Sequence, residues 1–516
     1  MGSKISTQCA DPGVSHDEDR ISTLPDHLLH NILSFIPTQD AVRTGVLSRR
    51  WQRVWIEVPT LAFSDETRPT AGFAGSLEKV LAGSHDDQHQ HVHVDVLEIS
   101  VSHPLHIARA NVWLQQAMER VHGSTSISFV FPPNDFWSAS AGDRVVLDLP
   151  SGGRTTALSL DFSLYGIGTL RVPPVSAALV PSSLTELSLE SLRLDGSRFS
   201  DLVSSCCPRL RKLFLRICGD MDYLRLSNDA LEDLDLHFPC PPSGSPGGLR
   251  QLQVSSRNLR RLSIHEIFSP EVRCNEVHDG SKVASFRTPR LEHLFWTCSA
   301  YMHPSRIEFA DSLATVRHLD LALVTHAWVG DTYHYHNKLA VWLLRHCTGV
   351  RCLNVSLWNF ARDPMETVRV LDEASLAQYE DLMVSVPQLS SVVELTVVTM
   401  MDHHAYGASI ASLLSRCKYV ERLTILVSDK RFEHDYACVD ATVCWCKCPA
   451  NWREQKLRLD FLRQVDFRGF KETTGWMADL SRLLPSSETN GASEGSTTPL
   501  VVQMTEPESN GPGIRS

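Results

Sequence analysis

Cysteine and histidine gather near the C-terminal end of the sequence, where their spacing comes closest to a metal site. Cys444, Cys446 and Cys448 alternate along the chain, and His434 and Cys438 lie just upstream. Thiolate and imidazole groups are the usual ligands of structural zinc. Alternation on a strand places all three cysteines on one face, however, and the paired Cys-x-x-Cys spacing of zinc sites is missing. The pattern therefore argues against a zinc site.

A second polar cluster precedes a strand-like stretch in the N-terminal part of the sequence. Its members are His85, Asp86, Asp87, His89, His91 and His93. These groups could ligate a divalent metal, but the interpretation we favour is a solvated loop that leads into a strand. The sequence also lacks the G-x-S-x-G and H-E-x-x-H motifs and a glycine-rich phosphate loop. We therefore expect no catalytic centre, no cofactor and no enzymatic activity.

The totals indicate a protein with more than one structural unit. Its 516 residues exceed one ordinary core, so a small domain with a repeat array, or roughly two to four domains, would fit. A net charge of −11 argues against a nucleic-acid partner. Neither a signal peptide nor a membrane-spanning stretch is present. We therefore expect a nuclear or cytosolic protein whose 14 cysteines are reduced.

The first residues offer one route to a membrane surface. Residues 1–6 fit the short myristoylation pattern at Gly2, and Cys9 offers a position for a second lipid. The alternative is a chance match inside a polar leader, residues 1–18, whose composition predicts disorder. Because the pattern is short, we favour the chance match over the lipid anchor.

The stretch from Asp19 to Trp55 is patterned as three short helices. Pro25 lies at the start of the first helix, where no backbone donor is lost, and Pro37 ends it. Thr38 and Ser48 are placed to cap the other two. The apolar positions are Leu28, Leu29, Ile32, Leu33 and Ile36, then Val42, Val46 and Leu47, then Trp51 and Trp55. So small a unit cannot enclose a complete core, so the rest of the chain or a partner protein must cover its apolar surface.

A family resemblance bears on this choice. Asp-Arg-Ile-Ser-x-Leu-Pro-Asp at 19–26, with Val-Leu-Ser-x-Arg-Trp at 46–51 and Trp55, is similar to the F-box of plant F-box/leucine-rich-repeat proteins. The match covers nearly the whole motif, and Gly45 stands where the family more often has serine. The resemblance implies an F-box at 19–59 that docks to a Skp-type adaptor and, through it, to a cullin complex.

From Leu184 onward the sequence repeats a unit of the form apolar-x-x-apolar-x-apolar. The units start at Leu184, Leu210, Leu231, Leu259, Leu291, Val316, Val350, Val392, Val420 and Leu462. The starts are 21 to 42 residues apart, mostly at or above leucine-rich spacing. The last two apolar residues of each unit share one side of a strand. We therefore expect an α/β fold in which a curved leucine-rich-repeat solenoid with a parallel sheet follows the helices.

The residue between those two apolar positions faces the opposite, exposed side of the sheet. These positions are Ser188, Phe214, Asp235, Ser263, Phe295, Asp320, Asn354, Thr396, Thr424 and Asp466. Exposed aromatic side chains favour contact with a partner, so Phe214, Phe295 and Asp320 are our predicted target-binding residues. The alternative is that flanking loops cover the two phenylalanines.

The convex side of the solenoid is expected to alternate between short extended segments and helices. A second apolar register precedes three units, at Leu224 and Leu226, Leu252 and Val254, and Ala284 and Phe286. Helical segments are expected at 199–205, 339–346 and 410–415. Each of these ends just before a cysteine, Cys206, Cys347 or Cys417, which we expect to be buried rather than reactive.

The end of the array resembles a second family feature. Trp-Cys-x-Cys-Pro at 445–449, followed by Leu462 to Lys471, is partly similar to the opening of the FBD region of plant F-box proteins. The expected units are a disordered leader (1–18), the F-box (19–59), a linker or cap (60–91), the repeat array (92–470) with an FBD-like segment (about 444–485), and a disordered tail (486–516).

Together the resemblances imply a substrate-recognition subunit of an SCF-type (Skp-cullin-F-box) ubiquitin ligase, with a target protein on the repeats. The expected adaptor-binding residues are Leu24, Pro25 and the exposed part of Leu28, Leu29, Ile32 and Leu33. The expected F-box core is Ile36, Val42, Val46, Leu47, Trp51 and Trp55. One alternative is a repeat-based binding scaffold without a role in degradation. Another, a hydrolase in an unusual fold, is opposed by the missing motifs.

Overall fold

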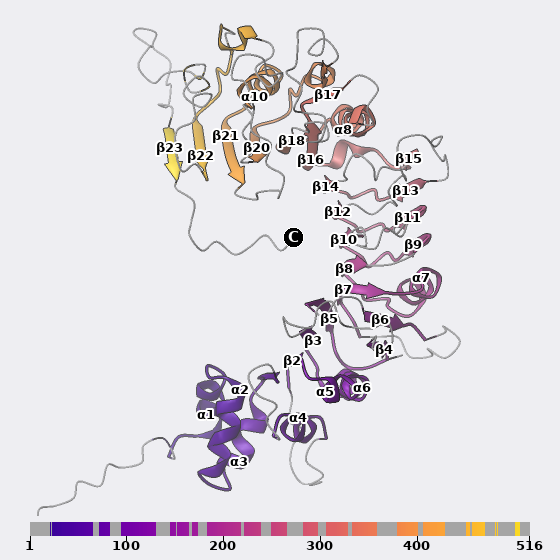
Figure 1. The fold of residues 1–516 in the computed structure, drawn as a ribbon, viewed down its shortest axis with the longest axis vertical. Helices are drawn as coiled ribbons and strands as arrows, with labels where there is room; N and C mark the ends of the chain where they lie inside the picture. Colours follow the sequence, from indigo (N-terminus) through magenta and orange to yellow (C-terminus); the bar gives the residue numbers. More distant parts are fainter. Residues whose placement is uncertain are drawn as a thin grey trace, which may run out of the picture.

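The computed structural model describes residues 21, 23–65, 72–82, 94–130, 145–150, 152–164, 168–173, 183–217, 221–238, 249–265, 282–297, 306–328, 333–358, 379–400, 406–428, 450–454, 457–469, 480, 482, 484 and 501–505. A small helical unit lies at one end, and the strands that follow are stacked into a curved row (Figure 1). The predicted order of a helical unit followed by a curved α/β solenoid is confirmed.

The helical unit is built from elements shorter than the pattern predicts. They are α1 (Asp26–Leu33), α2 (Thr38–Arg43), the 3-10 turn η1 (Thr44–Val46), α3 (Trp51–Val54) and the 3-10 turn η2 (Trp55–Glu57). The Ser48 hydroxyl accepts a hydrogen bond from the amide of Trp51 at 3.4 Å, as expected of a cap. Thr38 instead accepts one from the amide of Ala62, which ties α2 to the first strand.

One parallel sheet runs through the whole row. In order of pairing its strands are β1 (Thr60–Ser64), β2 (Val96–Val101), β3 (Ser124–Val130), β5 (Ala157–Leu164), β7 (Glu186–Arg193), β8 (Lys212–Ile217), β10 (Asp233–His237), β12 (Arg261–His265), β14 (His293–Thr297), β16 (His318–Val324), β18 (Cys352–Trp358), β20 (Glu394–Met400), β21 (Arg422–Ser428), β22 (Gln464–Arg468) and β23 (Val501–Thr505). Short β4 (Val146–Asp148) and β6 (Gly168–Arg171) join it beside β7.

The register of this sheet confirms the repeat unit. The middle apolar residues form one buried column: Leu187, Leu213, Leu234, Leu262, Leu294, Leu319, Leu353, Leu395, Leu423 and Val465. The sheet also begins earlier than residue 92, because β1 pairs with β2. The segment expected as a linker or cap thus holds β1 and α4 (Phe73–Ala82).

The convex side carries a second sheet and several helices. Strands β9 (Tyr223–Ser227), β11 (Gln251–Ser255), β13 (Val283–Arg287) and β15 (Arg306–Phe309) pair in parallel and place the second apolar register in line, which confirms that prediction. The helices are α5 (Pro104–Ile107), α6 (Ala110–Arg120), α7 (Gly196–Ser205), α8 (Tyr333–His346) and α10 (Gly407–Leu414). The remaining elements are η4 (Leu313–Thr315), η5 (Leu382–Ser385), η7 (Ala450–Glu454), and the antiparallel pair β17 (His326–Trp328) and β19 (Tyr379–Asp381).

The cysteines that follow the three predicted helices are buried, as expected. Cys206, Cys347 and Cys417 all lie inside the solenoid beside the sheet. Burial raises the pKa of Cys347 and of Cys417 to about 12. Both therefore remain protonated thiols at neutral pH, which suits a packing role.

The tail is not wholly disordered. Residues 501–505 form β23 and pair with β22, so the expectation of disorder over 486–516 is wrong for these five residues. Val501 and Val502 have the branched side chains that strands favour, but the serine, glycine and glutamate around them dominated the composition of the segment. Gly2 and Cys9 lie outside the described residues, as do the polar cluster at 85–93 and the cysteines at 438–448.

A buried carboxylate joins the helical unit to the repeats. Asp65, directly after β1, accepts hydrogen bonds from the amide and hydroxyl of Ser102 at 2.6 and 2.7 Å and from the amide of His103 at 3.1 Å. The Nδ1 atom of His106 lies 2.7 Å from Oδ2 of Asp65. Burial alone would raise the pKa of Asp65, but these hydrogen bonds together lower it below its usual value.

We expect Asp65→Asn to lower the free energy of unfolding by about 1.5–3 kcal/mol, because it removes the charge from several hydrogen bonds in a buried site. Urea unfolding at pH 7 measures this change. The matched control is Asp95→Asn, at an exposed carboxylate just before β2. Equal, small effects of the two substitutions would mean that the Asp65 contacts contribute little to the junction.

In the part of the chain that the structure describes, none of the helices combines the length and the apolar character needed to cross a membrane. Over the same residues, no three histidine, cysteine or carboxylate side chains are grouped so that they could hold a metal ion.

Candidate protein-binding surface

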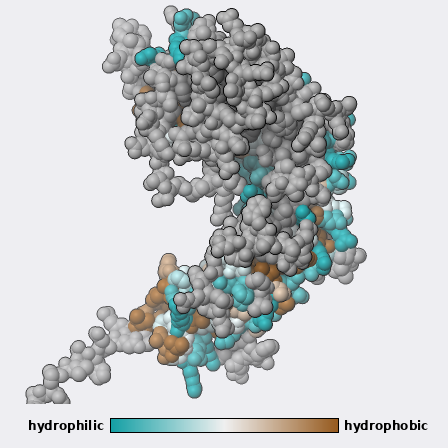
Figure 2. Space-filling model, in the orientation of Figure 1, coloured by the Kyte–Doolittle hydropathy of each residue, from teal (hydrophilic) through white to brown (hydrophobic). Residues whose placement is uncertain are grey.

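Large apolar side chains are exposed mainly on the helical unit. We call the following set the apolar patch: Leu28 (41% exposed), Ile32 (47%), Phe35 (81%), Ile36 (37%), Val46 (87%) and Leu47 (65%). Figure 2 shows apolar residues gathered over this end of the molecule. In the rest of the described chain, large exposed apolar residues are scattered along the solenoid. A concentration of this kind on so small a unit is typical of a protein-binding surface.

The first helix is apolar on two adjacent stripes rather than on one face. Leu29 and Leu33 are buried, whereas Leu28 and Ile32 are exposed. Residues four apart lie above one another on a helix, so each stripe is continuous. Only the outer stripe is available to a partner, and it continues through Phe35, a residue that the sequence prediction missed although its helical spacing from Leu28 and Ile32 indicates the same side.

The buried stripe rests on the two tryptophans. Trp51 and Trp55 are 6% and 4% exposed, as predicted for core residues, and Val42 is half-buried against the same core. Leu24 is half-buried and packs on this core, while Pro25 is exposed. The inner face of the helical unit is therefore buried in a core that continues into β1 and α4.

Three residues assigned to the core lie instead on the surface, so that part of the prediction is wrong. They are Ile36, Val46 and Leu47. Helix α2 ends at Arg43 and the chain continues as η1, whose three-residue turn changes which side chains face inward. Gly45 takes the inward position: a Cβ atom there would lie 3.5 Å from Nε1 of Trp55. Val46 and Leu47 therefore add a second exposed segment, separate in sequence from α1, to the apolar patch.

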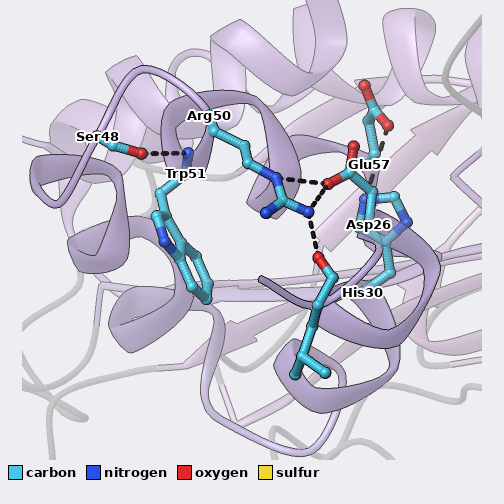
Figure 3. A network of polar contacts seen from close by, with 7 residues as sticks. Asp26, His30, Ser48, Arg50, Trp51 and Glu57 are labelled. Atoms are coloured by element: carbon cyan, nitrogen blue, oxygen red, sulfur yellow. Dashed lines mark hydrogen bonds and ion pairs between the residues drawn. The ribbon is translucent and has the colours of Figure 1, made fainter. Parts of the chain in front are cut away.

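Arg50, which directly precedes α3, links that helix to the N-terminal end of α1 (Figure 3). Its Nε donates to Oδ1 of Asp26 at 2.8 Å, its Nη2 donates to the same atom at 2.5 Å, and Nη2 also donates to the carbonyl oxygen of Leu24. Nε2 of His30 lies 3.6 Å from a carboxylate oxygen of Glu57. These contacts hold the Leu24–Asp26 turn in place, so the exposed Pro25 and the outer stripe of α1 are presented by a fixed backbone.

A second surface lies on the exposed side of the large sheet. The intervening residues of all ten units fall in a single register column, from Ser188 through Phe214, Phe295 and Asp320 to Asp466. Phe214, Phe295 and Asp320 are each half-buried. Asp320 accepts a hydrogen bond from Asn354, and burial raises its pKa above the usual value. The three residues are too far apart in the column to form one compact site, since Phe214 and Phe295 are three strands apart.

Comparisons with known proteins agree with both parts of the molecule. The F-box domain family matches residues 21–61, close to the predicted 19–59. The chain is 30% identical over 233 residues to F-box/LRR-repeat protein 25 of Arabidopsis thaliana, covering 42% of this chain and 74% of that protein. An F-box/FBD/LRR-repeat protein of the same plant is 26% identical over 318 residues, covering 59% and 65%. An FBD-associated F-box protein is 27% identical over 364 residues, covering 65% and 82%.

The chain spans about half the length of some other curated relatives: the matched part covers 50% of one Arabidopsis F-box protein and 55% of another F-box/FBD/LRR-repeat protein. Two of the relatives are nevertheless covered over most of their length, 74% and 82%. With an F-box motif on the helical unit and a leucine-rich parallel sheet behind it, the chain belongs to the plant F-box/LRR-repeat family, with an FBD-like C-terminal region.

Proposed function

We propose that this protein is a substrate-recognition subunit of an SCF-type ubiquitin ligase. The apolar patch binds a Skp-type adaptor, and the repeat array binds a target protein. The observation that carries the proposal is the exposure of Phe35, Val46 and Leu47 beside a core that is already closed. The core that the helical unit shares with the first strands leaves these side chains in water, whereas a partner that covered them would remove their apolar surface from water.

The proposed mechanism is positioning, without chemistry in this chain. A target on the curved sheet would be held at a fixed distance from the adaptor, the cullin and the ubiquitin donor, which raises its effective concentration there. The continuous sheet from β1 to the repeats supports this role, because a rigid connection between two binding surfaces preserves their separation. We place the protein in the nucleus or the cytosol, with the Gly2 lipid anchor as the less favoured alternative.

A charge introduced into the patch tests the adaptor surface. We expect Val46→Asp combined with Leu47→Asp to weaken binding to a purified Skp-type adaptor by about 100-fold or more, because unpaired charges would be buried at the interface. Both side chains are exposed in the free protein, so the melting temperature should change little. Isothermal calorimetry and thermal melts measure the two quantities.

The control is Val384→Asp, at an exposed valine of η5, far along the solenoid. It should leave adaptor binding unchanged. If the wild-type protein binds no Skp-type adaptor, the ligase proposal fails and a repeat-based binding scaffold without a degradation role takes its place. If the double variant binds as well as the wild type, the adaptor surface lies elsewhere.

A further inference from the structure

Carboxylates and flat rings lie together on the exposed side of four consecutive strands. We call this set the concave strip: Asp235 on β10, His237 on β10, His265 on β12, Phe295 on β14 and Asp320 on β16. Asp235, Phe295 and Asp320 share one register column, and His237 and His265 are adjacent in the next. The four strands lie one after another on the inner side of the curve, with the second sheet on the outer side (Figure 1).

The rings form a continuous surface. The centroid of the His265 ring lies 4.5 Å from that of Phe295 and 5.6 Å from that of His237. Nδ1 of His265 is 3.0 Å from the hydroxyl of Thr297, which fixes the ring. Burial lowers the pKa of His237 and of His265 to about 4. At neutral pH the strip therefore presents uncharged rings, which suit stacking by a planar cation.

Asp235 is a carboxylate without a strong partner. Its Oδ1 atom is shielded from water and accepts no hydrogen bond, although the side chain as a whole is 32% exposed. Nε2 of the uncharged His265 lies 3.7 Å away, too far for a hydrogen bond. Burial, together with the nearby Asp233 and Glu190, raises the pKa of Asp235 to about 6. An incoming cation would offset this cost of desolvation.

The neighbouring carboxylates differ in this respect. Glu186 pairs with Lys212 at 2.7 Å, and Asp233 lies 3.6 Å from Arg261. Within the described residues, neither a lysine nor an arginine lies within ion-pair distance of Asp235 or of Asp320. Glu186 and Asp233 are thus each paired with a cation, whereas Asp235 and Asp320 are open to a basic partner.

We propose that the concave strip binds an extended basic segment of the target protein, in which two arginines pair with Asp235 and Asp320 and stack on the rings of His265 and Phe295. This proposal rests on the proposed function as a target receptor. Arginine fits better than lysine, because its planar guanidinium can donate to a carboxylate through two N–H groups and stack on a ring at the same time.

The geometry also sets the spacing of the two arginines. Asp235 and Asp320 are three strands apart in one column, or roughly 14 Å at the usual separation of paired strands. An extended chain rises about 3.3 Å per residue and points every second side chain to the same side. Two arginines four positions apart in the segment therefore match the two carboxylates.

Fluorescence anisotropy with the full chain tests this proposal. The probe is a fluorescein-labelled peptide of glycine and serine with two arginines four positions apart. We expect it to bind the wild-type protein. Asp235→Asn and Asp320→Asn should each weaken binding about tenfold, whereas Asp222→Asn, at an exposed carboxylate outside the concave strip, should not.

The peptide chemistry gives a second test on the unmodified protein. Replacing both arginines with uncharged citrulline should weaken binding at least tenfold. A peptide whose two arginines are adjacent in sequence should bind only as tightly as a peptide with a single arginine. Equal binding of the arginine and citrulline peptides, or no binding of the arginine peptide, would overturn the proposal. Adaptor binding is measured on the same protein samples, so loss of the peptide site with retained adaptor binding separates this proposal from the ligase function.

Discussion

Alanine in place of Trp51 should lower the free energy of unfolding of the helical unit by about 3–5 kcal/mol, the range for truncating a large buried aromatic residue. Trp51 is 6% exposed and begins α3, a helix of four residues. It shares the core with the fully buried Leu29 and with Trp55. A unit this small has few other buried contacts that could compensate, so we expect the F-box to unfold while most of the repeat sheet remains folded.

Two readouts separate this effect from a loss of the adaptor surface. Hydrogen exchange should increase in α1 to α3 of the Trp51→Ala protein and remain protected in the central strands of the solenoid. Adaptor binding should be lost with the fold. The control is Gln52→Ala, at the exposed neighbour on α3, which should leave stability within about 0.5 kcal/mol of the wild type. A Trp51→Ala protein with unchanged protection in α1 would show that the tryptophan is not required for the core.

The solenoid was predictable from the sequence because its signal is repeated. Each unit has the same two-residue alternation, and a wrong assignment in one would break the register of the others. The predicted columns through Leu234 and Asp235 therefore agree with the strand pairing. The strand at Val501 was missed because it occurs once, at the edge of the sheet, inside a polar segment without a repeat to support it.

The surface of the F-box was less predictable for a physical reason. Apolar side chains are alike whether they pack inside or bind a partner, and their direction depends on where a helix ends. The end of α2 at Arg43 turns Val46 and Leu47 outward, a change of one or two residues that helix patterns do not resolve. The pattern likewise could not separate Leu28 from Leu29, since these adjacent residues fall on different stripes of one helix, one exposed and one buried.

Acid should destabilise the solenoid through His237 and His265. Each has its pKa lowered to about 4 in the folded protein, chiefly by burial, against about 6.5 when unfolded. Between these pH values the two histidines are protonated in the unfolded chain and neutral in the folded chain. Stability is therefore highest above pH 6.5 and falls as the pH drops toward 4. One pKa unit corresponds to about 1.4 kcal/mol, and with residual solvent screening we expect about 2 kcal/mol from each histidine.

Asp235 acts in the opposite direction. Its pKa is raised to about 6 by burial first and then by Asp233 and Glu190, so the folded protein takes up a proton more readily than the unfolded chain. It thus gains stability as the pH falls from 6 to about 4, by up to about 2 kcal/mol. Arg216 also faces His237 and favours its neutral form. The two histidines together therefore lower the stability of the wild type in acid, and Asp235 reduces the size of this loss.

The variant His237→Gln combined with His265→Gln isolates these terms. Glutamine keeps a polar side chain that does not titrate, so the double variant should lose the acid sensitivity of the pair and keep the opposite contribution of Asp235. Relative to the wild type, the change in unfolding free energy over this range should differ by about 4 kcal/mol. Urea unfolding at several pH values measures it, with His27→Gln, at an exposed residue of α1, as the control. Parallel pH profiles for the wild type and the double variant would show that the two rings are not held neutral on the concave face.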